Sequence, residues 1–316
     1  MSAPSLLIQE VETNLASYSD YACRVFHGRG HAFPQYEHIN IEWYPPYLFV
    51  QNHQETLSDP IKAELLSLFE QHTDIQAILI QNRSWPELTT EILTERSKTT
   101  LPLTLWSKLN NDISCQVTLG KNRNTGVFLD MRAGWKWVQE NSQGKNVLNL
   151  FSYSSVFSLF SLDGGASKVI NMDMSAGALK TAQRNHNHNP IGNGKAAFYK
   201  RDILKSASQY SKMGPYQLII IDPPPYQKNS FSGWKDYQKL LLRCEKCLSA
   251  EGKILACLNN PQVTKDDFLS KLKDIFSSAN QFESIESSKE IKEVDNSKGL
   301  KIISIHFSST QTETNN

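Results

Sequence analysis

The 316-residue sequence lacks several patterns that would place it in a class at once. No uninterrupted apolar run approaches the roughly 20 residues of a membrane-spanning helix, and residues 1–21 lack the basic and then apolar pattern of a secretory signal. The net charge is also close to zero, because the sequence has 33 lysines and arginines and 32 acidic residues. We therefore expect a cytoplasmic protein with no membrane partner, while the overall charge gives no information about nucleic acid.

Cysteine is scarce, with five scattered residues that do not form the even set of a disulfide framework. Cys244 and Cys247 make a C-x-x-C pair, but no second pair completes a four-ligand zinc site. Both lie in a stretch with a helical pattern, where positions three apart share a face. Helix packing is the prediction for this pair, and no metal is expected.

The glycine fingerprint of dinucleotide-binding proteins is missing, and so is a Walker sequence. In dinucleotide folds G-x-G-x-x-G follows the first strand and lets the pyrophosphate approach a helix N-terminus. The corresponding turn here, Phe151-Ser152-Tyr153-Ser154-Ser155, has no glycine. A Rossmann dehydrogenase is therefore the weakest of the functional interpretations.

From Lys145 onward, buried-strand patterns alternate with helical patterns, and a pair of strands closes the chain. This order predicts an α/β fold with a Rossmann-like, doubly wound sheet of seven strands and a terminal hairpin. The expected strands are 145–150, 168–173, 196–202, 216–222, 253–258, 282–287 and 300–307, with helices at 154–162, 175–187, 203–210, 235–248 and 264–277.

The chain before this region predicts a smaller α+β domain at 1–119, with a role in substrate recognition. The catalytic domain is expected at 120–307 and a disordered tail at 308–316. Arg24 to His31, which is basic and contains two glycines, suits a loop that brings cations and amides to an anion, or a plain solvated turn. Expected strands are 39–43, 47–50, 75–80 and 113–119, with a helix at 58–70, a loosely packed helix or arm at 1–20 and an irregular connection at 99–112.

Three acids directly end strands of the α/β region. Asp173, Asp202 and Asp222 end the second, third and fourth strands, at the edge where open α/β sheets bind ligands. An acid about 20 residues beyond the first turn accepts hydrogen bonds from ribose hydroxyls, and Asp202 can meet an adenine amino group. The alternative for Asp173 is that it only caps the next helix. S-adenosylmethionine carries ribose and adenine without phosphate, so it fits both the acids and the glycine-free turn.

The fourth strand leads into Asp222-Pro223-Pro224-Pro225-Tyr226. Consecutive prolines keep their carbonyls outside sheet and helix ladders, and Tyr226 can stack on a planar base. Asp222 with the carbonyls of Pro223 and Pro224 can hold an acceptor nitrogen opposite a methyl donor. A stiff exit from the strand is the structural alternative, and Lys228 and Lys235 in the next loop suit either phosphate contacts or simple solvation.

In this order the motifs resemble a known family. From Arg24 to Phe307 the chain is similar to the bacterial class I S-adenosylmethionine-dependent methyltransferases that modify bases of large-subunit ribosomal RNA. Arg24 to Gly30 resembles a branch of that family without an assigned substrate. The matching stretches are Gly126–Arg132, Val147–Tyr153, Asp173–Ser175, Arg201–Asp202, Asp222–Pro224, Gly233–Tyr237 and Asn296–Lys301.

The resemblance implies S-adenosyl-L-methionine as cofactor and RNA as substrate, with ribosomal RNA as the first candidate. It also implies cofactor contacts from Phe151, Ser152, Tyr153, Asp173, Asp202 and Asp222, with Asp130 and Arg132 near the cofactor mouth. Asn149 and Met174, which lie in the matching stretches, complete the predicted cofactor-binding set. The catalytic residues predicted from the proline run are Asp222, Pro223, Pro224 and Tyr226.

Two departures from the family bear on the mechanism. Thr-Gly normally follows the tyrosine of the first turn, whereas Ser154-Ser155 stands here and crowds the methionine end of the cofactor. Members that methylate cytosine C5 have a nucleophilic cysteine shortly after the fifth strand, where this chain has Asn259. Cys257 falls inside the strand, as expected of buried core. Direct transfer to a nitrogen of an RNA base is therefore the prediction.

Two alternatives stay open. A methyltransferase of this type can act on a protein or a small molecule, and near-neutral charge does not decide against either acceptor. The second alternative is a degenerate, non-catalytic RNA-binding module, which Ser154-Ser155 suggests.

Overall fold

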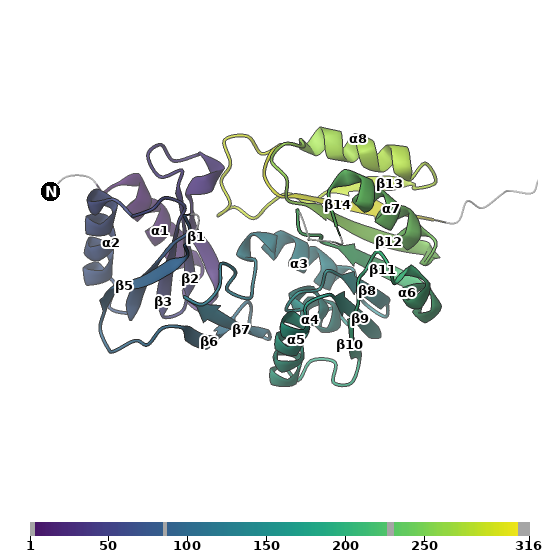
Figure 1. Ribbon diagram of the computed structural model, residues 1–316, viewed down its shortest axis with the longest axis horizontal. Coiled ribbons are helices and arrows are strands. Elements are labelled where there is room, and N and C mark those ends of the chain that lie inside the picture. Colours follow the sequence, from purple (N-terminus) through teal and green to yellow (C-terminus); the bar gives the residue numbers. More distant parts are fainter. Residues whose placement is uncertain (1–3, 85–86, 226–230, 309–316) are drawn as a thin grey trace, which may run out of the picture. The chain divides into compact units, whose positions relative to one another are not determined.

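The structure of the protein, a computed structural model, describes residues 4–84, 87–225 and 231–308. The chain divides into two compact units, Met1–Arg132 with Ser287–Asn296 and Ala133–Glu286 with Ser297–Asn316 (Figure 1). The division differs from the predicted boundary after Leu119. Residues 120–132 belong to the first unit because they bond to it: the amide of Thr118 donates to the Thr125 carbonyl (2.8 Å), and Arg24 pairs with Asp130 (3.2 Å). The predicted tail beyond Ser308 lies outside the described residues.

The second unit contains a seven-stranded sheet in the order β10-β9-β8-β11-β12-β14-β13. Neighbours from β10 to β12 are parallel, and β14 is antiparallel to both β12 and β13. This confirms the predicted doubly wound sheet with a terminal hairpin. The strands are β8 (Asn146–Leu150), β9 (Lys168–Asp173), β10 (Ala196–Lys200), β11 (Tyr216–Ile221), β12 (Leu248–Leu258), β13 (Gln281–Ser284) and β14 (Lys301–His306).

Helices cover both faces of this sheet, as strands that are buried on both faces require. One face packs on α6 (Ala207–Met213), α7 (Trp234–Glu245) and α8 (Lys265–Ile275), which share a buried cluster with strand residues such as Leu148 and Ile219. On the other face, α4 (Val156–Asp163) bonds to β9 through Ser158 and Asn171 and stacks Phe160 on Trp135 of α3 (Arg132–Glu140). The remaining helix, α5 (Ala176–His188), packs against β9 and β10.

All five cysteines are buried and free. Cys244 packs inside α7 as predicted, whereas Cys247 lies in the turn after the helix ends at Glu245. Within the described residues, no group of three or more His, Cys, Asp or Glu side chains is arranged to hold a metal ion. The helices in the same part of the chain include none that is long and apolar enough to cross a membrane.

The first unit contains a five-stranded sheet in the order β1-β2-β3-β4-β5, a separate β6–β7 hairpin and the helices α1 and α2. The two helices cover one face of the sheet, where Ile41 and Val50 join Leu7 and Leu65 in a common core. The elements are α1 (Leu6–Ser17), β1 (Cys23–His27), η1 (Gly28–Gly30), β2 (Ile39–Tyr44), β3 (Tyr47–Asn52), α2 (Asp59–Gln71), β4 (Ala77–Asn82), β5 (Thr89–Glu95), β6 (Leu103–Lys108), β7 (Ser114–Leu119) and η2 (Leu129–Met131).

Several expectations for the first unit are wrong. The helix expected within residues 1–20 is present as α1, but it is not loosely packed, because it buries Leu7 and Val11 completely. The expected irregular connection at 99–112 contains β6, and β5 has no counterpart in the predicted strands.

The stretch from Arg24 to His31 is also not the predicted loop, since it forms strand β1 and a short 3-10 turn. Its glycines serve packing. A Cβ at Gly28 would lie 2.0 Å from the Tyr36 carbonyl oxygen, and one at Gly30 would lie 2.0 Å from that of Lys292. Only glycine allows the backbones to approach this closely.

Candidate cofactor site

The residues that follow β8, β9, β10 and β11 lie along one edge of the seven-stranded sheet. Leu150 is in register with Met172 on one side and with Ile221 on the other, and Asp173 is in register with Lys200. Because these strands are parallel, the first turn and the three predicted acids follow their carboxyl ends. The edge includes the point between β8 and β11 where the strand order reverses, which is where open α/β sheets bind ligands.

Asp173 links the first turn to the second strand. Its carboxylate is 8% exposed, and it accepts hydrogen bonds from the amides of Tyr153 (2.9 Å) and Ser175 (2.8 Å). The N-cap of α5 is Ser175, whose hydroxyl accepts from the amide of Ala178 (3.1 Å). Asp173 is thus not the N-cap residue itself, although it accepts from the amide of that residue. Each of its oxygens has a second lone pair that can accept from a ligand hydroxyl.

The first turn, residues 151–155, is strained. Phe151, Tyr153 and Ser155 have φ values of 56°, 47° and 61°, in the left-handed region that costs roughly 1–2 kcal/mol for a residue with a side chain. The Oγ atoms of Ser152 and Ser155 are also buried and have no hydrogen-bond partner among the described residues. Strained backbone and unsatisfied buried hydroxyls gather at ligand sites, and here they occur in one turn.

We expect Ser155→Gly to stabilise the protein. Ser155 is the N-cap of α4 but makes no side-chain capping bond, so the substitution loses no hydrogen bond and removes left-handed strain. The expected gain is about 1 kcal/mol in the free energy of unfolding, measured by urea denaturation. Ser154→Gly is the control, because Ser154 does not have a positive φ; an equal gain there would show that strain at Ser155 is not the cause.

The ends of β10 and β11 carry the other acids. Asp202 is half-buried, and its carboxylate accepts from the Lys205 amide (3.3 Å) and lies 3.3 Å from Lys205 Nζ. Asp222 and Pro224 are half-buried, while Pro223 is buried. Tyr226, the predicted stacking residue, and Lys228 lie outside the described residues.

Tyr237 of α7 joins the ends of the two strands beside the switch point. Its hydroxyl donates to the carbonyl of Cys257 at the end of β12 (2.9 Å) and lies 3.4 Å from that of Ile221, which precedes Asp222. The side chain is buried against Phe231 and Phe268. The sequence assigned it no site role, although it belongs to the stretch Gly233–Tyr237 that matches the family.

Asn149 and Met174 were both predicted to bind the cofactor. The Asn149 side chain is 1% exposed and donates to Asn171 Oδ1 (2.9 Å), and Asn171 in turn donates to Ser158 Oγ of α4 (3.0 Å). This buried chain of bonds ties β8, β9 and α4 together, so Asn149 supports the turn from within the sheet. Met174 is half-buried directly after Asp173.

Asp130 and Arg132 lie in the first unit. Asp130 accepts from Arg24 (3.2 Å), and the Arg132 guanidinium lies over the Tyr18 ring and 3.4 Å from Glu290. These partners give both residues a structural role within that unit. Their contact with a cofactor stays a prediction.

The sequence profile of the family described as S-adenosylmethionine-dependent methyltransferase matches residues 23–306. The chain belongs to this methyltransferase family. The match includes the whole seven-stranded sheet and most of the first unit.

Curated relatives of this methyltransferase align with about half of the chain. Ribosomal RNA large subunit methyltransferase I of Pseudoalteromonas translucida is 35% identical over 143 residues, which cover 43% of this chain and 36% of that protein. Methyltransferase K/L of the same organism is 33% identical over 157 residues, or 48% of this chain and 22% of that protein. The chain thus spans little more than a third of the length of the first relative and less than a quarter of the second.

Two solved structures share the fold along most of the chain. A putative SAM-dependent methyltransferase from Streptococcus mutans has a TM-score of 0.79 and 23% identity over 95% of this chain and 80% of that one. SMU.776, a putative methyltransferase solved in complex with SAH, has a TM-score of 0.80 with the same identity and coverage. At this identity the likeness establishes the fold.

The residues at the carboxyl edge fit S-adenosylmethionine, the cofactor of this family. Each Asp173 oxygen has a second lone pair that can accept from a ligand hydroxyl, and the unsatisfied hydroxyls of Ser152 and Ser155 are further polar groups in the first turn. The same edge has no glycine-rich turn of the kind that cradles a pyrophosphate. The donor set therefore suits a nucleoside cofactor without phosphate.

Proposed function

We propose that this methyltransferase transfers a methyl group from S-adenosylmethionine to a nitrogen of an RNA base, with ribosomal RNA as the first candidate and the cytoplasm as the location. The observation that supports the cofactor half is Asp173, a buried carboxylate that accepts from two amides at the carboxyl end of β9. The substrate half is supported by the curated relatives, which are named as ribosomal RNA large subunit methyltransferases.

In this proposal each group at the edge of the sheet has one task. Bound S-adenosylmethionine supplies a methyl group on a sulfonium, which is electrophilic without further activation. Asp173 holds the ribose hydroxyls, and Asp202 meets the adenine amino group. Asp222 and the carbonyls of Pro223 and Pro224 orient the acceptor nitrogen, with Tyr226 stacking on its base. Most of the rate enhancement then comes from holding donor and acceptor in line.

Cys257 favours a nitrogen acceptor over cytosine C5. A C5 methyltransferase needs an accessible thiolate that adds to the base. Cys257 is completely buried in β12, and this burial raises the pKa of its thiol well above the ordinary value. The exposed residue after the strand is Asn259, which is no nucleophile. Direct transfer needs none.

The test is methyl transfer from labelled S-adenosylmethionine to unmodified large-subunit ribosomal RNA, beside a total-protein fraction and a small-molecule extract. The expected result is label in RNA only, with nucleoside mass spectrometry placing the methyl group on a ring or exocyclic nitrogen. Label in protein or in small molecules would instead support the alternative of a methyltransferase with a protein or small-molecule acceptor. Cofactor binding without any transfer would favour the non-catalytic module.

Cys257→Ser is expected to retain full activity in this assay. The thiol lies in the buried core, and serine replaces only its sulfur atom by a smaller oxygen. The variant therefore keeps the fold, and burying the hydroxyl lowers the stability by about 1 kcal/mol. The measurement is kcat with ribosomal RNA at saturating cofactor. A fall of about 10³-fold or more, which loss of a covalent nucleophile produces, would restore the C5 mechanism.

A further inference from the structure

The two faces of the five-stranded sheet in the first unit differ in character. The face toward α1 and α2 carries Ile41, Val50 and Ile78 in the apolar core. The opposite face also contains buried apolar residues such as Phe49 and Leu79, but beside them it carries polar residues in register, each of which is at most 7% exposed as a whole residue. They are Arg24 and His27 on β1, Asn40 and Glu42 on β2, Gln51 on β3 and Gln81 on β4. Burying so many polar groups is unfavourable unless each is paired. Packing of the core does not require polar residues at these positions.

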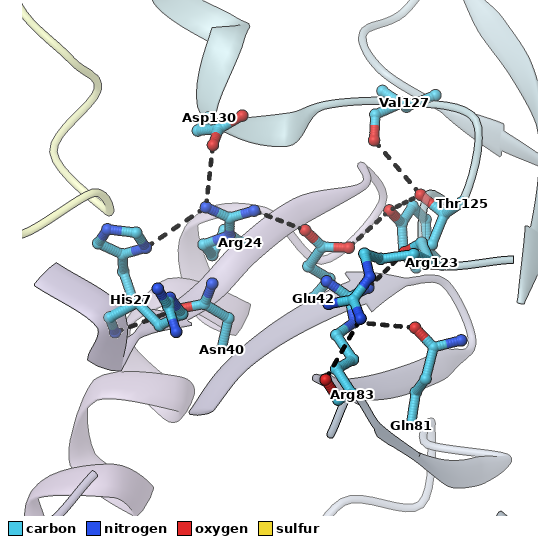
Figure 2. A network of polar contacts seen from close by, with 12 residues as sticks. Arg24, His27, Asn40, Glu42, Gln81, Arg83, Arg123, Thr125, Val127 and Asp130 are labelled. Atoms are coloured by element: carbon cyan, nitrogen blue, oxygen red, sulfur yellow. Dashed lines mark hydrogen bonds and ion pairs between the residues drawn. The ribbon is translucent and has the colours of Figure 1, made fainter. Parts of the chain in front are cut away.

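The topology brings several cations to one edge of this polar face. β2 is antiparallel to both β1 and β3, and β3 is parallel to β4, so β1, β3 and β4 run in the same direction. Arg29, His53 and Arg83 follow the carboxyl ends of these three strands. Arg123 reaches the same place from the loop after β7, and Figure 2 shows its side chain beside Arg83 and Glu42.

The charge of Arg24, which lies on the polar face itself, is already neutralised. Arg24 lies 2.8 Å from Glu42 and 3.2 Å from Asp130, and the Tyr44 hydroxyl donates to the second Glu42 oxygen (2.8 Å). Both oxygens of Glu42 are therefore bonded, one to Arg24 and one to the Tyr44 hydroxyl. Figure 2 shows Arg24 between Glu42 and Asp130.

Arg83 and Arg123 are held against one another by uncharged acceptors. Arg83 Nη2 donates to the Arg123 carbonyl (2.6 Å), Arg123 Nη2 donates to the Arg83 carbonyl (3.3 Å), and Arg83 Nε donates to Gln81 Oε1 (2.9 Å). In the part of the chain that the structure describes, no carboxylate forms an ion pair with Arg29, Arg83 or Arg123. Three positive charges are thus gathered without a matching anion.

The pKa values of two groups, Arg83 and His53, reflect the positive charges gathered here. Burial, reinforced by Arg123 and Arg24 and opposed by Glu42, lowers the pKa of Arg83 to about 10. Burial lowers the pKa of His53 to about 3, and Arg29, Arg83 and Arg123 contribute in the same direction. His53 is therefore neutral at physiological pH. Its Nε2 atom is buried and has no partner among the described residues.

We infer that Arg29, Arg83, Arg123 and His53 form a binding site for a phosphate group of the RNA substrate. The inference rests on the proposed function and adds where the first unit holds the RNA. Guanidinium groups match phosphate oxygens in pairs, and an anion there would offset the charges that now repel one another. A backbone contact of this kind positions RNA without reading its sequence.

The test compares Arg123→Gln with Lys62→Gln. Arg123 is exposed, so its loss leaves the core intact. Lys62 is a matched cation on α2, which packs on the apolar face of the same sheet. Binding of a fluorescent single-stranded ribosomal RNA fragment is measured by anisotropy over a series of salt concentrations. We expect Arg123→Gln to weaken binding about tenfold at low salt and to reduce the slope of log K against log salt by about 0.7, while Lys62→Gln changes neither.

Three further measurements decide the result. Arg123→Lys keeps the charge and is expected to recover the salt slope, while Arg83→Gln should repeat the loss seen with Arg123→Gln. Wild-type affinity and slope in both glutamine variants, or an equal loss in Lys62→Gln, would overturn the site. Loss of inorganic phosphate binding with unchanged RNA binding would assign the site to a free phosphate and overturn the RNA contact. If the wild-type protein methylates RNA while these variants bind it normally, the phosphate site is refuted and the proposed function stands. If the wild-type protein transfers no methyl group to RNA, the proposed function itself is refuted.

Discussion

Replacing Asp173 with alanine should abolish measurable binding of S-adenosylmethionine at micromolar concentrations. The carboxylate is buried at the carboxyl end of β9 and is aligned by the amides of Tyr153 and Ser175. Hydrogen bonds from ribose hydroxyls to a charged acceptor contribute about 1.5–3 kcal/mol each, so loss of two weakens binding by about 100-fold or more. The same change frees the Tyr153 amide and loosens the strained first turn, which adds to the loss. Isothermal titration calorimetry measures the affinity directly.

Asp163→Ala is the matched control for this experiment. Asp163 is the last residue of α4 and accepts a hydrogen bond from Gln139 of α3. The variant therefore removes the same carboxylate from the same unit without touching the first turn, and we expect wild-type affinity for the cofactor. Asp173→Asn keeps the shape and one acceptor oxygen, and should fall between wild type and alanine. Unchanged affinity in Asp173→Ala would mean that Asp173 only braces the turn and that the ribose lies elsewhere.

The cofactor half of the molecule could be predicted because its signals are local. The strands β8, β9 and β11 are short apolar runs that end in polar residues, and the order of strands and helices restricts the topology to very few choices. Even there, helix α6 begins at Ala207 rather than at the predicted Ile203. Asp202 accepts from the Lys205 amide and thereby extends the turn before the helix, a side-chain bond that periodicity does not report.

The backbone of the first turn could not be predicted. Its lack of glycine indicated that phosphate is not bound, but did not reveal that Phe151, Tyr153 and Ser155 adopt the left-handed conformation. Two hydrogen bonds tie the turn to β9, from the Ser152 amide to the Met172 carbonyl (3.0 Å) and from the Tyr153 amide to Asp173. A third lies within the turn, from the Ser155 amide to the Ser152 carbonyl (2.6 Å). The departure from Thr-Gly to Ser154-Ser155 is visible in the sequence, and its physical consequence is strain at Ser155.

Long-range pairing explains the errors in the first unit. Residues 287–296 come from the connection between β13 and β14, yet they belong to the first unit. Tyr18 donates to Glu290 (3.2 Å), His27 lies 3.1 Å from Glu293, and Lys292 lies 2.6 Å from Glu10. Each bond joins residues more than 260 positions apart, so no local pattern announces it. The two glycines of η1 likewise suggested a loop from Arg24 to His31, because the Lys292 backbone that Gly30 accommodates is not visible in the sequence.

Arg24→Met should be the most destabilising single change on the polar face of the first unit. Its guanidinium is buried and paired with Glu42, which is 2% exposed, and with Asp130. Burial alone lowers the pKa of an arginine, but Asp130 and Glu42 more than compensate and raise that of Arg24 above its ordinary value. Methionine fills a similar volume, so the main loss is the charge that balances Glu42. Removing one partner of a buried ion pair costs about 3–5 kcal/mol, measured as the free energy of unfolding in urea.

A double-variant cycle separates the ion pair from packing. Glu42→Gln in the Arg24→Met background removes the second buried charge and should recover at least about half of the loss, because the cost comes from leaving one charge uncompensated. Lys62→Met is the control, since Lys62 lies 3.9 Å from Glu91 in a more exposed pair and should cost less than about 1 kcal/mol. If Arg24→Met costs no more than Lys62→Met, or if Glu42→Gln adds to its loss, the pair does not hold the polar face together.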